Sequence, residues 1–213
     1  VPFDVCQPVL EDAAPELAAA YSVPVHAVVG DFERHLGHLP AGGPTLVAFL
    51  GGTIGNLGPD ERARFLATLG AHMAPGDWLL LGTDLVKDPA RLVAAYDDPA
   101  GVTAEFNRNV LHVLNRELRA DFAPEQYDHV ALWNAERSWI EMHLEARTAQ
   151  QVQVADLGLR VEVAAGERIH TEISAKLTLD GVADELAAAG FEPVTQMTDA
   201  AGDFALTLAA APN

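Results

Sequence analysis

Several apolar stretches of this chain end in residues that suit the binding of a small polar ligand. The stretch LVAFLGGTIGNL, residues 46–57, passes from an apolar strand into three glycines, Thr53 and Asn56. Glycine is favoured where a backbone turns sharply or approaches a ligand closely. In an α/β sheet, ligands bind outside the carboxyl ends of the strands. Gly51, Thr53 and Asn56 are therefore the first candidates for a binding cleft.

Two carboxylates occupy comparable positions after the preceding apolar stretches. Asp4 lies near the end of VPFDV, and Asp31 follows PVHAVVG and precedes Phe32. An acid at such a strand end can accept hydrogen bonds from the ribose hydroxyls of a nucleotide, and another can meet an adenine amino group. A surface or capping role for Asp4 and a helix N-cap role for Asp31 are the alternatives. Taken with the glycine-rich turn, the two acids indicate an adenosyl ligand lying across the sheet.

The stretch HTEIS, residues 170–174, carries a third candidate group. In an extended chain, residues two apart point the same way, so Glu172 and Ser174 would face one ligand together. Their acceptor and hydroxyl match an imidazole, which has one N–H and one bare nitrogen, although other ligands would fit too. An exposed strand end with no ligand is the alternative.

The sequence offers no conventional nucleophile or metal motif. There is no G-x-S-x-G, no H-x-x-x-H and no P-loop, and Cys6 has no neighbouring base. The eight histidines are scattered along the chain, so we interpret each as structural or exposed and expect no metal site. A cosubstrate that brings its own electrophile would remove the need for a nucleophile, so we expect no dedicated catalytic residue.

The elements that must position these residues alternate between strand and helix at first. Near-continuous apolar strands separated by helices predict a parallel sheet covered on both faces. We expect strands at 1–5, 24–32, 45–52 and 75–86, with helices at 10–21 and 59–72.

After residue 86 the pattern changes and then returns. Residues 90–119 are helical in character, and residues 124–138 form a mixed connector. Alternating stretches at 138–154 and 159–174 predict an antiparallel sheet with one open face. A helix at 178–190 and a strand at 202–209 resume the first pattern. We therefore expect an α/β domain made of residues 1–86 and 177–213, with a second α+β domain, residues 87–176, inserted in it.

Composition limits the classes of function. The 213 residues are 49% hydrophobic, which suffices for one large domain with a core. The net charge of −18 argues against nucleic-acid binding, and the apolar runs are too short to cross a membrane. A single cysteine and no visible signal peptide indicate the cytoplasm.

Long and unusual segments carry a resemblance to a known family. FLGGTIGNL, LLLGTDLVKDPARLVAAYDDPAGVTAEFNRNVLHVLNRELRADF, WIEMHLEA and GERIHTEISAKL resemble the ergothioneine-pathway L-histidine Nα-methyltransferases, almost from end to end. The resemblance implies an S-adenosylmethionine-dependent enzyme that trimethylates the α-amino group of L-histidine to hercynine. It also implies a class I, Rossmann-like methyltransferase sheet with a smaller substrate-binding domain.

The resemblance also implies roles for particular residues. Asp4 would hold the ribose of S-adenosylmethionine, and Asp31 and Phe32 would meet its adenine. The cleft would be lined by Gly51, Thr53 and Asn56, with Asn56 and Tyr96 orienting the amino-acid end of L-histidine; Glu172 and Ser174 would bind its imidazole, and Met142 would line that pocket.

Two departures from the family pattern modify these expectations. The family's first strand with its glycine-rich loop, and its N-terminal helices, have no counterpart in this chain, which opens at VPFDV. We therefore expect this chain alone to be neither a stable monomer nor active unless a missing N-terminal segment completes the sheet. Gln196 and Met197 also stand where the family often has tryptophans. The alternatives are a non-catalytic fragment, or a methyltransferase of the same family that acts on another small amine.

Overall fold

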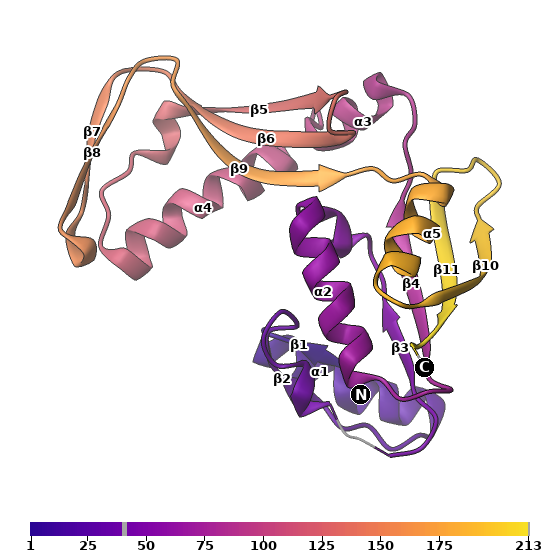
Figure 1. Ribbon diagram of the computed structural model, residues 1–213. Coiled ribbons are helices and arrows are strands. Elements are labelled where there is room, and N and C mark those ends of the chain that lie inside the picture. Colours follow the sequence, from indigo (N-terminus) through magenta and orange to yellow (C-terminus); the bar gives the residue numbers. More distant parts are fainter. Residues whose placement is uncertain (40–41, 213) are drawn as a thin grey trace.

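The computed structural model describes residues 1–39 and 42–212, and its largest sheet has four strands in the order β10-β11-β4-β3 (Figure 1). These strands are β3 (Leu46–Phe49), β4 (Trp78–Asp84), β10 (Glu192–Thr198) and β11 (Phe204–Ala210). β3 runs parallel to β4, whereas β11 is antiparallel to both of its neighbours. The chain leaves this sheet after β4 and returns to it only near residue 192, as the interrupted sequence pattern predicts.

Helices α2 (Pro59–His72) and α5 (Leu179–Ala188) build the core of this part of the molecule. α2 buries Phe65, Leu66 and Leu69 in the same cluster as Leu79 of β4. The helix has the bounds that the sequence predicts, because Pro59 suits a first helical position and the Glu61 carboxylate accepts from Gly58 N at 2.7 Å.

The first elements form a small sheet of their own. β1 (Phe3–Asp4) pairs in parallel with β2 (Val28–Val29), and α1 (Gln7–Tyr21) connects them. Both strands are shorter than the predicted 1–5 and 24–32. α1 begins earlier than predicted and contains Pro15.

An apolar cavity of about 330 Å³ separates the outer edge of β1 from the outer edge of β3. Leu46 of β3 is 57% exposed at this edge. The cavity is lined by Val1, Pro2, Phe3, Phe32, Leu36, Leu39, Thr45, Leu46, Val47, Ala48, Phe49, Phe65 and Leu69. Two strand edges therefore face each other across a gap in the part of the chain that the structure describes.

The inserted segment forms a second, antiparallel sheet in the order β5-β6-β9. Its strands are β5 (Tyr127–Asn134), β6 (Trp139–Ala146) and β9 (Arg168–Ala175), and the hairpin of β7 (Gln150–Val154) and β8 (Leu159–Val163) extends beyond it. β6 buries Ile140, Met142 and Leu144 on one face, as its alternating sequence predicts. The interpretation of 124–138 as a connector is wrong, because β5 occupies most of it. β5 has polar residues on both of its faces, so its sequence shows no clear alternation of apolar and polar residues.

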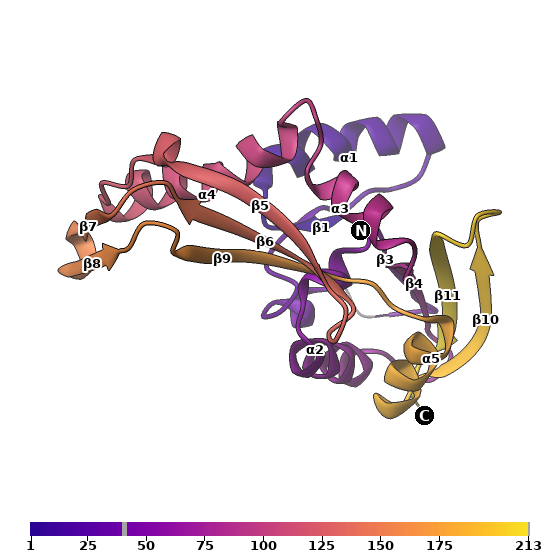
Figure 2. The same ribbon diagram turned by 90° about the horizontal axis from the view of Figure 1, so that it is seen from above.

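Two helices cover the buried face of the β5-β6-β9 sheet (Figure 2). They are α3 (Pro89–Tyr96) and α4 (Val102–Leu118), where the sequence suggested one helical region at 90–119. The helical region is divided near Asp98. Its carboxylate accepts hydrogen bonds from Thr103 N at 2.7 Å and from Val102 N at 3.1 Å, and so caps the start of α4. These hydrogen bonds lower the pKa of Asp98 to about 2.

The remaining elements are short or lie at an edge. β10 was not predicted, since it is a largely exposed edge strand that contains Pro193 and polar residues. Single 3₁₀ turns occur at Leu36–His38, Thr53–Asn56, Pro124–Gln126 and Ala155–Leu157. Among the described residues, no helix combines the length and apolarity that crossing a membrane requires.

Candidate functional site

A pocket of about 460 Å³ lies where the two large sheets meet, beyond the carboxyl ends of β3 and β4. Its volume is in the range of small-molecule sites. β9 runs from the inserted segment toward the carboxyl ends of β3 and β4, and the chain then continues to α5, β10 and β11 (Figure 1). The lining residues are Gly51, Gly52, Thr53, Asn56, Asp84, Lys87, Tyr96, Ser174, Lys176, Asp203 and Phe204.

The glycine-rich turn forms one wall of this pocket. Gly51 and Gly52 have φ values of 81° and 74°, a conformation that other residues adopt only at a cost. Gly55 is needed for a different reason, since a Cβ there would lie 2.8 Å from the carbonyl oxygen of Ala175 in β9. The turn therefore packs directly on the backbone of β9, and this contact brings Thr53 and Asn56 to the pocket.

A buried lysine connects the opposite walls. The side chain of Lys176 is 1% exposed, and its ammonium lies 2.8 Å from an Asp84 carboxylate oxygen at the end of β4. It also donates to the hydroxyl of Tyr96 at 2.9 Å and to that of Ser174 at 2.8 Å. Tyr96 in turn donates to Ser174 at 2.7 Å. All three hydrogens of the ammonium are thus used, as a buried charge requires.

A second group of charges borders the pocket near β11. Lys87 donates to Asp84 at 2.6 Å and to the carbonyl oxygen of Asp203 at 2.8 Å. Arg91 binds the Asp203 carboxylate through two nitrogens, and this contact lowers the pKa of Asp203. Within the described residues the pocket is therefore lined by paired charges.

The predicted imidazole-binding residues lie on one strand but in different surroundings. Glu172 and Ser174 both belong to β9, where Glu172 pairs with Met142 of β6. Ser174 lines the pocket, whereas Glu172 and Met142 do not. Burial raises the pKa of Glu172, and Lys176 opposes that shift. Met142 is 3% exposed in a cluster that Tyr96 borders.

The predicted cofactor residues lie away from this pocket, at the carboxyl ends of β1 and β2. The exposed carboxylate of Asp4 accepts from Cys6 N at 2.8 Å. Asp31 accepts from Glu33 N at 2.9 Å, a local cap of the kind that the sequence left open. Phe32 packs edge-on against Phe49 and Phe65 in the core. The two acids therefore share a sheet edge, and Phe32 faces the apolar gap.

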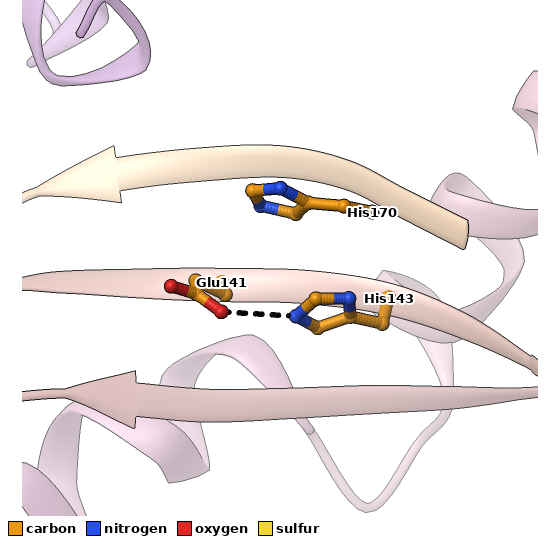
Figure 3. Close-up of side chains that lie close together, drawn as sticks. All are labelled: Glu141, His143 and His170. Carbon is orange, nitrogen blue, oxygen red and sulfur yellow. Dashed lines mark hydrogen bonds and ion pairs between the residues drawn. The ribbon is translucent and has the colours of Figure 1, made fainter. Parts of the chain in front are cut away.

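One group of side chains could hold a metal ion, although the sequence indicated none. The donor atoms of Glu141, His143 and His170 lie within 4.8 Å of one another on β6 and β9 (Figure 3). The carboxylate of Glu141 already accepts from Trp139 at 2.8 Å, from Asn134 at 2.8 Å and from His143 at 3.1 Å. These contacts, led by the bond from Trp139, lower the pKa of Glu141 to about 2. Hydrogen bonds within the protein thus satisfy this carboxylate.

Sequence reasoning missed several residues that line the pocket, above all Lys176 and Asp84. Lys176 continues the spacing of two that begins with Glu172 and Ser174, so the same argument could have included it. Asp84 follows an apolar strand, as Asp4 and Asp31 do. The convergence of Tyr96, Ser174 and Lys176 depends on the tertiary structure and has no signal in local spacing.

Comparisons with known proteins identify the family of this chain. A family described as "Histidine-specific methyltransferase, SAM-dependent" matches residues 1–211. The "Histidine N-alpha-methyltransferase" of Mycolicibacterium smegmatis is 57% identical over 98% of this chain, and the protein of that name from Mycobacterium tuberculosis is 56% identical over 99%. The chain spans 65% and 66% of these two relatives.

A solved structure supports the fold. An S-adenosylmethionine-dependent methyltransferase from Clostridium acetobutylicum superposes with a TM-score of 0.50 over 99% of this chain and 74% of that one, at 9% identity. Such low identity shows the fold alone. The expected class I methyltransferase fold is confirmed.

Proposed function

Since the chain belongs to the family of histidine-specific, SAM-dependent methyltransferases, we propose that it provides most of an enzyme that methylates the α-amino group of L-histidine. The methyl donor is S-adenosylmethionine, and three transfers give hercynine, the first step of ergothioneine biosynthesis. The pocket that joins the glycine-rich turn to Tyr96 and Ser174 carries this proposal, because it brings groups suited to both ends of an amino acid to the sheet edge where class I ligands bind.

In this proposal the two sheets have separate tasks. Residues 1–86 and 177–213 bind the methyl donor, with Asp4 on the ribose and with Asp31 and Phe32 near the adenine. The exposed carboxylate of Asp4 suits two hydroxyl donors. Residues 87–176 form the substrate-binding domain.

The substrate is held by residues from both sheets. Asn56 and Tyr96 orient its amino-acid end, beside Gly51 and Thr53. Ser174 and Glu172 bind the imidazole, and Met142 supports that part of the site from the adjacent strand.

Catalysis depends on aligning the amine, the methyl group and the sulfur of the methyl donor. The sulfonium of S-adenosylmethionine supplies the electrophilic methyl group, which the neutral amine attacks in line with the departing sulfur. The residues of this chain hold and align the amine, which must lose a proton before each transfer, and we assign none of them as a dedicated base or nucleophile. Asn56 and Tyr96 are neutral, and the two ammonium groups that line the same pocket, those of Lys87 and Lys176, are both paired with Asp84.

We further propose that an additional apolar strand occupies the gap between β1 and β3. Among the described residues, β1 and β3 are each the last strand of their sheet, and the lining of the cavity between them is mainly apolar. Open apolar strand edges favour pairing with another strand. Such a segment would complete the sheet and add the missing part of the cofactor site.

The test is expression of residues 1–213 with and without an N-terminal segment that carries this strand. A monomeric, cooperatively unfolding and active chain without the segment would contradict the proposal.

Turnover distinguishes the proposed activity from the alternatives. The intact protein is incubated with S-adenosylmethionine and single amino acids, and products are identified by mass spectrometry. We expect mono-, di- and trimethylated L-histidine, with little methylation of other amino acids. Preference for another amine would support a different methyltransferase. A calorimetric titration in which S-adenosylhomocysteine does not bind would support a non-catalytic chain.

A further inference from the structure

Lys176 determines how the hydroxyl of Ser174 can bond. A serine hydroxyl has one hydrogen to donate and two lone pairs that accept. The ammonium of Lys176 occupies one lone pair at 2.8 Å, because it has only donors. Tyr96 donates to the same oxygen at 2.7 Å. The phenol is the stronger acid of the two hydroxyls, which favours this direction.

Ser174 has only one group left to offer to a ligand. Both of its lone pairs are occupied, so only its own hydrogen remains for a ligand. Ser174 lines the pocket, and the opposite residue on β6, Ile140, is apolar. The hydrogen is therefore available to a group in the pocket that accepts a hydrogen bond.

We propose that Lys176 is a positioning residue that, together with Tyr96, fixes Ser174 as a hydrogen-bond donor and so selects, between the two protonation states of the ring, the one with a bare nitrogen. This inference rests on the proposed function, because it takes the imidazole of L-histidine as the group that Ser174 meets. The neutral ring offers an N–H to Glu172 and a bare nitrogen to Ser174. The protonated ring has no bare nitrogen and is excluded.

The ammonium of Lys176 also disfavours a protonated ring beside Ser174, whereas the carboxylate of Glu172 opposes this effect. Lys176 adds a positive charge beside the hydroxyl, and its partner Asp84 is shared with a second cation, Lys87. Glu172, on the same strand, is the acid that would attract a protonated ring. Tyr96 is the polar neighbour from α3. A protonated imidazole would thus meet an occupied oxygen and a nearby ammonium.

The test is the pH dependence of L-histidine binding to the intact protein. Dissociation constants are measured by calorimetry with S-adenosylhomocysteine present, from about pH 7.5 to about pH 5.0. The α-ammonium of free L-histidine lowers the pKa of its imidazole to about 6, so the neutral fraction and the wild-type affinity should fall about tenfold over this range. Tyr96→Phe and Lys176→Met each free one lone pair of Ser174, and in both the fall should shrink to less than about threefold.

Each outcome has a defined meaning. Tyr96→Phe removes no charge, so it decides the matter if Lys176→Met does not fold. A tenfold fall in both folded variants overturns the inference. A smaller fall in Lys176→Met alone also overturns it, because charge alone would then exclude the protonated ring. S-adenosylhomocysteine binding at each pH corrects for loss of the folded protein, and the Tyr96→Phe variant, which keeps Glu172 and Lys176, corrects for the titration of Glu172. If wild-type protein binds no L-histidine at any pH, the proposed function itself fails.

Discussion

The two ends of the proposed site are built in opposite ways. At the Ser174 end, the polar groups are buried and bonded to partners far away in the sequence, as Lys176 is to Asp84 and Tyr96. At the Asp4 end, the acids are partly or fully exposed, and their backbone partners lie two residues away.

We call the Ser174 end, with Tyr96 and Lys176, the prearranged half of the site, and the end with Asp4 and Asp31 the open half. Long-range bonds hold Ser174 and Tyr96 in place before any ligand arrives, which reduces the cost of ordering them on binding. Asp4 and Asp31 border a sheet that is interrupted by a cavity. We therefore expect substitutions in the first half to affect stability and selectivity strongly, and those in the second to affect mainly cofactor affinity.

The largest effect should follow Asp84→Asn. The amide leaves the ammonium of Lys176, which is 1% exposed, without its counter-charge. Removing one partner of a buried ion pair costs about 3–5 kcal/mol. Urea unfolding of the intact protein measures the loss. Asp31→Asn is the matched control, with an expected loss below about 1 kcal/mol, because the amide oxygen can still accept from Glu33 N. Equal losses would remove the contrast between the two ends.

Glu141→Gln tests a third region by its pH dependence, a carboxylate on β6 that lies outside the pocket and is bonded to near neighbours in the sequence. The pKa of Glu141 is lowered from 4.5 to about 2, so its ionised form stabilises the fold above about pH 4.5, and that contribution disappears as pH falls toward 2. The shift corresponds to about 3 kcal/mol. We expect Glu141→Gln to be less stable than wild type at pH 7 and to approach it by pH 3. The exposed Glu33→Gln is the control; a constant difference across pH would contradict the assignment.

Glu172→Ala tests the comparison through the catalytic activity toward L-histidine. A hydrogen bond to a charged group contributes roughly 1.5–3 kcal/mol, so kcat/KM for L-histidine should fall about ten- to a hundredfold. The affinity for S-adenosylhomocysteine should stay the same, since Glu172 lies on β9. An unchanged kcat/KM would show that Glu172 does not bind the imidazole.

The smallest of these effects is expected for Asp4→Asn in the open half. The change replaces one acceptor oxygen by a donor, and we expect a rise of about tenfold in the dissociation constant of S-adenosylhomocysteine. Unfolding should change little, because Asp4 is exposed. Calorimetry with L-histidine as a second titrant checks that the substrate half is intact. Equal cofactor affinity would count against the ribose assignment.

The sequence predicted the elements whose pattern local physics dictates. The bounds of α2 follow from Pro59 and its apolar face, and the alternation of β6 predicts its buried side. β5 and β10 were missed because partial burial and polar residues hide their period. β1 is shorter than its apolar sequence suggests, since one of its edges has no strand to pair with in the described residues.

The sequence predicted a site residue only where a side chain or glycine suited to ligand binding follows a recognisable apolar strand. Gly51, Thr53 and Asn56 follow an apolar strand, and they do line the pocket. Tyr96 entered through the family resemblance alone, and its bond to Ser174 joins residues 78 positions apart. Lys176 had a local signal in the spacing of two, but a lysine at a strand end is usually solvated, and only the fold shows it buried.

The contact between Gly55 and Ala175 limits how this scaffold can be redesigned. Any side chain at position 55 would collide with the backbone of β9. Consider a mutagenesis library designed to accept bulkier amino acids as substrates. It cannot enlarge the pocket by moving β9 away from the glycine-rich turn, because the contact between Gly55 and Ala175 would then be lost. Extra room has to come from shortening side chains in or next to the pocket, such as Met142, which is buried beside Glu172 and does not line the pocket itself. A screen that holds position 55 as glycine and varies position 142 would search the variants that this geometry permits.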